Sequence, residues 1–395
     1  MSGRTIAERL FSGRLIVCVG CGGVGKTTVA AALGIEAARA GRRTLVLTID
    51  PARRLADALG VELSGEAREI PLPALERSSG SLSALMLDMK RTFDGLVERF
   101  AENAEIRERI FANSIYQHVS DALAGSAEYS AMERVYQVAE SGDYDLIVVD
   151  TPPAQHALDF LEAPQRLIDF LDSRWVGLLI HPAFSASRLG FRLFQRGAQR
   201  ILRLLEGVTG LAFLEDLSEF LLAFEGMAAG FRERATEVRA LLLGPESRFV
   251  LVTGPEPESV RHAQEFFDRL EGFEVPLEGL IANRVRQWPE GSAFAVASEP
   301  SRAELEQVFT ERGESRDAAA ASARATLEML ASYARRVARD TDSLDVLRPR
   351  AAALGCFLRE IPELDTDVHD LEGLTRIGRH VLGPASPTHK AGAAS

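Results

Sequence analysis

The sequence predicts an α/β fold in which a mainly parallel sheet is covered by helices on both faces and an α-helical subdomain is inserted. Short, continuously apolar runs alternate with helical patterns, as expected for parallel strands that are buried on both faces. A glycine-rich loop joins the first apolar run to the first long helical pattern. Residues 157–243 show no strand pattern, so we interpret them as part of a helical insertion between strands of one sheet.

The composition narrows the class of protein. The chain has 395 residues, of which 46% are hydrophobic and 26% are charged, which is typical of a globular protein with one large or two moderate domains. The net charge of −12 and the absence of lysine and arginine runs argue against a nucleic acid partner. We find no secretory signal, no apolar run of the roughly 18 residues that a membrane span needs, and too few cysteines for a disulfide framework. The sequence therefore predicts a cytoplasmic protein.

The glycine-rich loop carries a phosphate-binding motif. Residues 20–28 read GCGGVGKTT, between an apolar strand at residues 15–19 and a helix that stops at Gly41. The spacing matches the pattern G-x-x-x-x-G-K-[ST], in which glycines let the backbone N–H groups wrap around a polyphosphate. The predicted nucleotide-binding residues of the loop are Gly22, Gly23, Val24, Gly25, Lys26, Thr27 and Thr28.

Two residues of the loop predict the ligands ATP and Mg²⁺. Lys26 supplies a positive charge to the β- and γ-phosphates, and the Thr27 hydroxyl is a magnesium ligand. The chain has only three lysines among its 45 basic residues, so the presence of one of them at this position supports a phosphate-binding role. The positive N-terminal end of the following helix points at the same anion.

Two acidic residues follow buried strands. Asp50 ends the apolar run 44–49, and Pro51 keeps it out of helical geometry. Asp150 ends the run 146–149, which is the arrangement that holds Mg²⁺ or its water shell. Ligands of open α/β sheets gather at the carboxyl ends of strands. We therefore expect Asp50 and Asp150 to lie at the ligand-binding edge of the sheet, with Asp150 beside Mg²⁺ or its water shell.

The rest of the chain sets the predicted domain organisation. Further strands are expected at residues 81–89, 248–253, 280–283 and 354–358, and an alanine-rich helix at residues 317–339. The predicted nucleotide-binding core is discontinuous and comprises residues 1–90, 141–160 and 246–385. Residues 91–140 and 161–245 form the predicted helical subdomain, and residues 386–395 form a disordered tail.

Several motifs together resemble those of the deviant Walker-A ATPases, and within them the arsenite-pump ATPase (ArsA) family. This family also holds the ATPase that targets tail-anchored membrane proteins. The resemblance covers about residues 14–383. It rests on the loop at residues 20–28, on DPA at residues 50–52, on DTPP and HALDFL within residues 150–161, on VTGPE at residues 252–256, on IAN at residues 281–283, and on PELDTDVH at residues 362–369.

The resemblance implies a dimeric ATPase whose two nucleotides face each other and whose helical subdomains open and close with hydrolysis. It implies that Lys26, Asp50 and Asp150 are catalytic and that both acids act on Mg²⁺ through water. It implies further that Asp50 orients and activates the attacking water and that Asn283 contacts adenine. It also implies that the loop from Pro362 to Asp367 covers the base, so that both residues bind the nucleotide. Two simpler interpretations stay open: Asp50 as a turn former before proline, and Asn283 as a polar strand cap.

The chain departs from the family pattern at Cys21. The family loop usually reads GKGGVGK, and its first lysine reaches the nucleotide of the partner subunit. A cysteine supplies no fixed cation, so a homodimer lacks this charge at the transferred phosphate. We consider three consequences: a heterodimer with a related ATPase that carries the lysine, an arginine that substitutes for it, or slow turnover.

Cysteine usage also bears on metals. The Cys-x-x-Cys zinc motif of the targeting ATPases has no counterpart in residues 287–317, so no zinc is expected. Arsenite binding takes clustered thiols, and the helical segments contain no cysteine. Activation by arsenite is therefore not expected.

Three uses of the ATPase activity remain open. The first is a chaperone or targeting factor whose apolar helical stripes at residues 194–231 bind an apolar client helix, although these stripes are also typical of bundle core. The second is the soluble ATPase subunit of an anion efflux system with a membrane-protein partner. The third is a regulatory ATPase whose dimerisation is the output.

Overall fold

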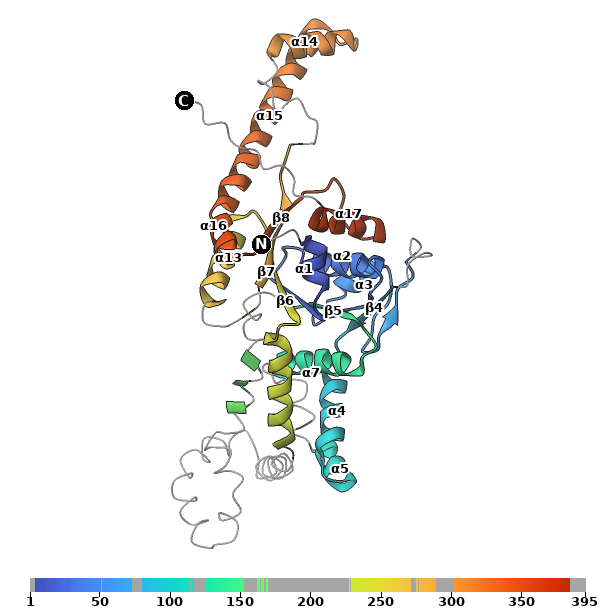
Figure 1. The fold of residues 1–395 in the computed structure, drawn as a ribbon. Helices are drawn as coiled ribbons and strands as arrows, with labels where there is room; N and C mark the ends of the chain where they lie inside the picture. The colour runs from blue at the N-terminus through green and yellow to red at the C-terminus, as the bar shows by residue number, and fades with distance from the viewer. Residues whose placement is uncertain are drawn as a thin grey trace, which may run out of the picture.

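A single mixed sheet organises the part of the chain that the structure describes (Figure 1). The computed structural model describes residues 4–50, 52–72, 80–113, 116, 126–152, 162–163, 165–166, 168–169, 227, 229–270, 275, 277–288 and 301–383. Within them the strand order is β3-β4-β2-β5-β1-β6-β7-β8. The strands are β1 (Leu15–Val19), β2 (Arg43–Thr48), β3 (Arg68–Glu69), β4 (Ser81–Met86), β5 (Leu146–Asp150), β6 (Ser247–Thr253), β7 (Leu277–Val285) and β8 (Phe357–Pro362).

The sheet is parallel except at one edge, where β3 pairs antiparallel with β4. β1 lies in the middle, paired with β5 on one side and β6 on the other. In the register, Cys18 and Thr48 are each the partner of Asp150, so β1, β2 and β5 end level with one another. The loops that follow these three strands therefore leave the sheet at the same edge, which confirms the predicted parallel α/β core.

Helices cover both faces of the sheet, as predicted. Ile16 and Cys18 of β1 belong to one core cluster, with α1 (Ile6–Phe11), α2 (Lys26–Arg39), α3 (Arg54–Leu59) and α17 (Leu371–Leu382). Leu15 and Val17 point to the other face. There they pack with α7 (Ser126–Ser141), α13 (Pro257–Leu270), α16 (Arg348–Ala353) and the helical residues 229–243. The alternation follows from the two-residue period of a strand.

Some element boundaries differ from the prediction. β4 ends at Met86, because Asp88 accepts a hydrogen bond from the Arg91 N–H and caps the next helix, α4 (Met89–Phe100). β8 begins at Phe357 instead of residue 354, because Gly355 adopts φ +69° and forms the turn after α16. The short edge strand β3 was not predicted.

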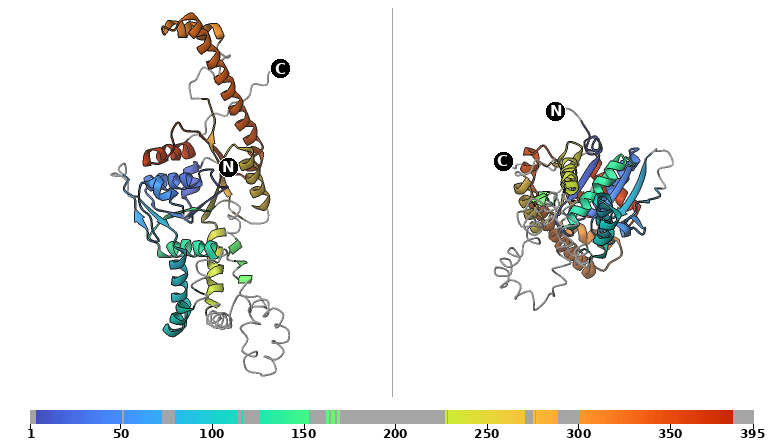
Figure 2. Two further views of the ribbon diagram at one scale, coloured as in Figure 1. Left: turned by 180° about the vertical axis from the view of Figure 1, so that it is seen from behind. Right: turned by 90° about the horizontal axis from the view of Figure 1, so that it is seen from below.

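Helices also extend away from the sheet in two directions (Figures 1 and 2). On one side lie α4, α5 (Ala104–Ala112) and residues 229–243. Within this part, Phe231 is buried against the rings of Phe100 and Tyr129, with centroid distances of 5.3 and 6.5 Å. Met227 and Phe231 are therefore core residues. The other residues of the apolar stripes, and the predicted tail, lie outside the described residues, and the domain division stays a prediction.

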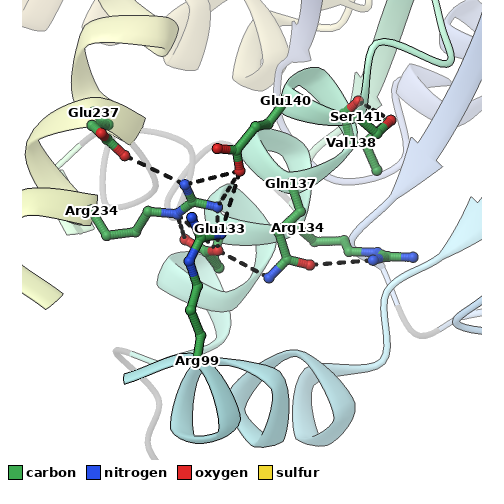
Figure 3. A network of polar contacts seen from close by, with 9 residues as sticks. All are labelled: Arg99, Glu133, Arg134, Gln137, Val138, Glu140, Ser141, Arg234 and Glu237. Carbon is green, nitrogen blue, oxygen red and sulfur yellow. Dashed lines mark hydrogen bonds and ion pairs between the residues drawn. The ribbon is translucent and has the colours of Figure 1, made fainter. Parts of the chain in front are cut away.

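A buried ion-pair network joins α4, α7 and residues 229–243 (Figure 3). The Arg234 side chain is 2% exposed and pairs with Glu133, which is fully buried, at 2.9 Å from Nε to Oε2. The guanidinium also pairs with Glu140 and Glu237 and lies over the Tyr136 ring, 3.9 Å from its centroid. This network fixes the relative position of the helices that lead into β5 and β6.

On the opposite side, α14 (Arg302–Glu311) and α15 (Arg316–Asp345) form a projecting hairpin (Figures 1 and 2). The lower half of α15 is attached to the chain that leaves β7. Asp340 accepts a hydrogen bond from the Arg286 N–H at 2.9 Å, and the Tyr333 hydroxyl donates to the Gln287 carbonyl at 2.9 Å. The ring of Trp288 meets Tyr333 edge-on at 5.2 Å.

Candidate active site

The glycine-rich loop runs from the end of β1 to the first turn of α2, and neighbouring strands fix its glycines. A Cβ atom on Gly20 would lie 2.0 Å from the Val252 carbonyl oxygen of β6, so no side chain fits there. Gly25 has φ +92°, and a Cβ atom there would lie 2.3 Å from Nδ2 of Asn283. These two close approaches explain why the loop needs glycine at both positions.

Lys26 lies across this loop. Its ammonium donates to the Cys21 carbonyl oxygen at 2.8 Å, and the residue is only 7% exposed. Burial lowers the pKa of Lys26, and the opposing charge of Asp150 limits that effect. A buried ammonium inside a loop of backbone N–H groups is suited to bind an anionic oxygen.

Asp150 lies between the loop and the end of β2. Its Oδ2 atom accepts hydrogen bonds from the hydroxyls of Thr27, at 2.7 Å, and Thr48, at 2.9 Å. Its Oδ1 atom is buried and accepts no hydrogen bond from the residues that the structure describes. Burial raises the pKa of Asp150 to about 6, although both hydroxyls and Lys26 act in the opposite direction. An unpaired carboxylate oxygen beside a threonine hydroxyl fits the oxygen ligands that Mg²⁺ and its water shell require.

Asp50 lies just beyond β2 in a local turn. Its Oδ1 atom accepts a hydrogen bond from the Ala52 N–H at 2.9 Å, and its own N–H donates to the Thr48 hydroxyl at 3.3 Å. Its Oδ2 atom is 3.7 Å from the Arg54 guanidinium, and its side chain is 22% exposed. The hydrogen bond to the Ala52 N–H is one that a turn-forming Asp makes, and the action of Asp50 on water stays a prediction. Thr48, which the sequence analysis missed, connects Asp50 to Asp150.

Asn283 approaches the loop from β7. Its side-chain amide donates to the Val24 carbonyl oxygen at 2.9 Å, and the residue is 5% exposed. The next residue, Arg284, donates from Nη1 to the Gly23 carbonyl oxygen at 3.4 Å. No motif in the sequence indicated Arg284. The structure brings Asn283 to the nucleotide loop, and its predicted contact with adenine stays a prediction.

The remaining predicted residues lie at the same edge of the sheet. Pro362 ends β8 opposite Val285 of β7, and the Glu363 N–H donates to the Val285 carbonyl oxygen at 3.0 Å. Asp367 is exposed in the loop that follows. Gly22 and Gly23 are exposed at the tip of the phosphate loop, whereas Thr28 is half-buried in the first turn of α2. The roles of Pro362 and Asp367 toward a base stay predictions.

The geometry therefore combines a phosphate loop, an inward lysine and a Thr27–Asp150 pair at the centre of a parallel sheet. The profile of the anion-transporting ATPase family matches residues 13–315. The chain belongs to this family. Its membership confirms the resemblance, and it identifies the chain as an ATPase that binds a nucleotide.

Individual relatives of this ATPase are distant in sequence. A protein of Aquifex aeolicus named arsenical pump-driving ATPase 1 is 25% identical over 278 residues, which cover 69% of this chain and 63% of the relative. The ATPase get3 of Schizosaccharomyces japonicus is 26% identical over 273 residues, covering 69% and 74%. The ATPase get3 of Neurospora crassa is 32% identical over 154 residues, covering 39% and 44%. The match thus spans less than two thirds of the Aquifex relative.

Crossing a lipid bilayer takes a helix that is both long and apolar, and this bears on the helices that the structure describes. None of them combines the length and the apolar character needed to cross it.

Proposed function

We propose that this ATPase is a dimeric switch that couples ATP binding and hydrolysis to the handling of a client or partner protein. The observation that carries the proposal is that the Asp150 carboxylate accepts hydrogen bonds from both Thr27 and Thr48. Through Thr27 and Thr48 it joins the phosphate loop to the turn that holds Asp50. A shift in the position of the bound phosphates can therefore be transmitted to the ends of both β2 and β5.

Two helices adjoin strands of the sheet at positions where such a shift would move them. α7 leads directly into β5, and residues 229–243 lead into β6, so both helices adjoin strands that flank β1. The network around Arg234 and Glu133 joins these helices through a buried ion pair. Movement of β5 at Asp150 is thus expected to move them together.

In this proposal, Lys26 binds the β- and γ-phosphates and the backbone of residues 22–28 cradles them. Thr27 would be a direct ligand of Mg²⁺, and Asp150 and Asp50 would act on its water shell. The cation would supply charge neutralisation at the phosphates. Asp50, being partly exposed at the rim, is available to orient the attacking water and to accept its proton.

Cys21 bears on the form of the dimer. It is half-buried and directly precedes the exposed Gly22 and Gly23 at the tip of the loop, where a partner subunit would approach. We favour a heterodimer with a related ATPase that carries lysine at this position, over a homodimer. The name of the Aquifex relative makes an efflux ATPase with a membrane-protein partner the second candidate. A thiol site for arsenite is not favoured, because Cys18 is buried in β1 and Cys356 lies at the other end of the sheet, before β8.

Three proteins test the proposal: the wild type, Lys26→Ala and Asp50→Asn. We expect Lys26→Ala to lose ATP binding, measured by calorimetry. Asp50→Asn should bind ATP but lose hydrolysis, and light scattering of this variant mixed with a related subunit should show a dimer only with ATP. Hydrolysis at the wild-type rate in Asp50→Asn would remove Asp50 from its role. A monomer in the presence of ATP, both alone and with a related subunit, would refute the dimeric switch.

A further inference from the structure

The backbone of Arg284 has an unusual conformation. Among the described residues it is the only one other than glycine with a positive φ, +60°. It lies at an irregularity in the pairing of β7 with β8, between Ala282 and Val285. A side chain in the left-handed region is disfavoured, and such conformations persist where the surrounding structure imposes them, often at functional sites. A strand bulge of this kind redirects a side chain.

The redirected side chain reaches the phosphate loop. Arg284 is exposed while Asn283 and Val285 on either side of it are buried. Its guanidinium donates to the Gly23 carbonyl oxygen, and the Asn283 amide donates to the next carbonyl, that of Val24. Two consecutive residues of β7 thus hold two consecutive carbonyls of the loop.

The planarity of the peptide bond gives these contacts a consequence. In a trans peptide the C=O of one residue and the N–H of the next point in opposite directions. Holding the Gly23 carbonyl therefore sets the direction of the Val24 N–H, and holding the Val24 carbonyl sets that of the Gly25 N–H. Both N–H groups belong to the part of the loop that cradles phosphate in the proposed function.

We propose that Arg284 is a positioning residue of the nucleotide site, which fixes the Gly23–Val24 peptide so that its N–H faces the bound phosphate. Asn283 does the same for the following peptide. Arg284 acts from outside the loop, where a glycine-rich backbone would otherwise rotate freely. Its permanent positive charge also favours an anion in the loop. The inference rests on the proposed binding of ATP at this loop.

The left-handed backbone makes the test selective. Glycine adopts φ +60° without strain, so Arg284→Gly removes the guanidinium while relieving the backbone. We expect the melting temperature of this variant to equal or exceed that of the wild type. Its Kd for ATP with Mg²⁺, measured by calorimetry, should rise roughly three- to tenfold, as expected for the loss of one typical, solvent-exposed hydrogen bond. Arg284→Lys should recover part of the affinity, because it restores the charge and a donor.

Arg302→Gln is the control variant for this test, and the wild type and Lys26→Ala are the reference proteins. Arg302→Gln removes an exposed arginine from α14, far from the loop, and should bind ATP as the wild type does. Wild-type affinity in Arg284→Gly would overturn the proposal, and so would a loss of affinity that parallels a loss of melting temperature. If Lys26→Ala binds ATP as tightly as the wild type, the proposed nucleotide site itself fails.

Discussion

The Thr27 hydroxyl donates to Oδ2 of Asp150 across 2.7 Å, and this bond joins the first turn of α2 to the end of β5. The carboxyl group is almost fully buried, and its other oxygen accepts nothing from the described residues. Its charged form is therefore costly in the folded protein without ligand. This cost has a measurable dependence on pH.

Asp150→Asn is expected to stabilise the ligand-free protein at neutral pH. The folded-state pKa is raised from 3.8 to about 6, so the wild type keeps its full stability below pH 3.8 and loses some as the pH rises through 6. Asparagine cannot ionise and avoids this loss. Above pH 7 its free energy of unfolding should exceed that of the wild type by up to about 3 kcal/mol, since two pKa units correspond to that amount. The difference should vanish near pH 4, as followed by urea unfolding.

Asp145→Asn is a control of opposite sign. The Arg43 side chain and backbone N–H hydrogen-bond to Asp145 and lower its pKa to about 2. Its contribution to stability is thus present above pH 3.8 and is lost as the pH falls through 2. This variant should be slightly less stable than the wild type at pH 7 and should converge with it in acid. If both variants change stability in the same direction at pH 7, the buried-charge explanation of Asp150 is wrong.

Gly20→Ala should be far more harmful than Gly60→Ala, although both glycines have positive φ. A Cβ atom at Gly20 would overlap the Val252 carbonyl, whereas at Gly60 it would meet nothing within 4 Å. Gly60→Ala should cost about 1 kcal/mol from its backbone alone. Gly20→Ala should cost at least twice that and abolish ATP hydrolysis, as measured by thermal unfolding and phosphate release. Equal losses of stability in the two variants would mean that β6 can shift away from the added Cβ atom at no cost in free energy.

Arg234→Met should destabilise the protein by about 3–5 kcal/mol, because it leaves the buried Glu133 carboxylate without its ion pair. The double variant Arg234→Met with Glu133→Leu removes both charges and should recover most of that loss. Urea unfolding of the two variants measures the difference. A double variant as unstable as the single one would show that the network acts through packing, not through charge.

Cys21→Lys should raise the ATPase rate of the isolated protein by about tenfold or more, because it adds a cation near the transferred phosphate. Cys21→Ser removes the thiol without adding charge and should leave the rate unchanged. Phosphate release at saturating ATP gives both rates. No increase with lysine would show that the missing charge does not limit turnover.

Much of the fold was predictable because the signal is local. The buried strands are short apolar runs, and the loop motif sits between the first of them and a helix that ends at glycine. The partners of Asp150 were less accessible, since Thr48 reaches it only through strand pairing 102 residues away in sequence. Arg284 could not have been predicted, because its left-handed backbone results from a bulge that depends on β8. The start of β8 was misplaced because an apolar leucine, Leu354, belongs to an exposed turn.

The attachment of α15 to the chain that leaves β7 determines how the hairpin would respond to a movement there. The helix is held by Tyr333 and Asp340 to residues that follow Asn283 and Arg284 by only two to five positions. From Tyr333 to its start at Arg316 it extends about 25 Å, at 1.5 Å per residue. A tilt of about 5° at the foot displaces the far end by roughly 2 Å. A rearrangement beside the nucleotide loop that tilted the helix would therefore displace the tip of the hairpin by a distance that a pair of spectroscopic labels can record.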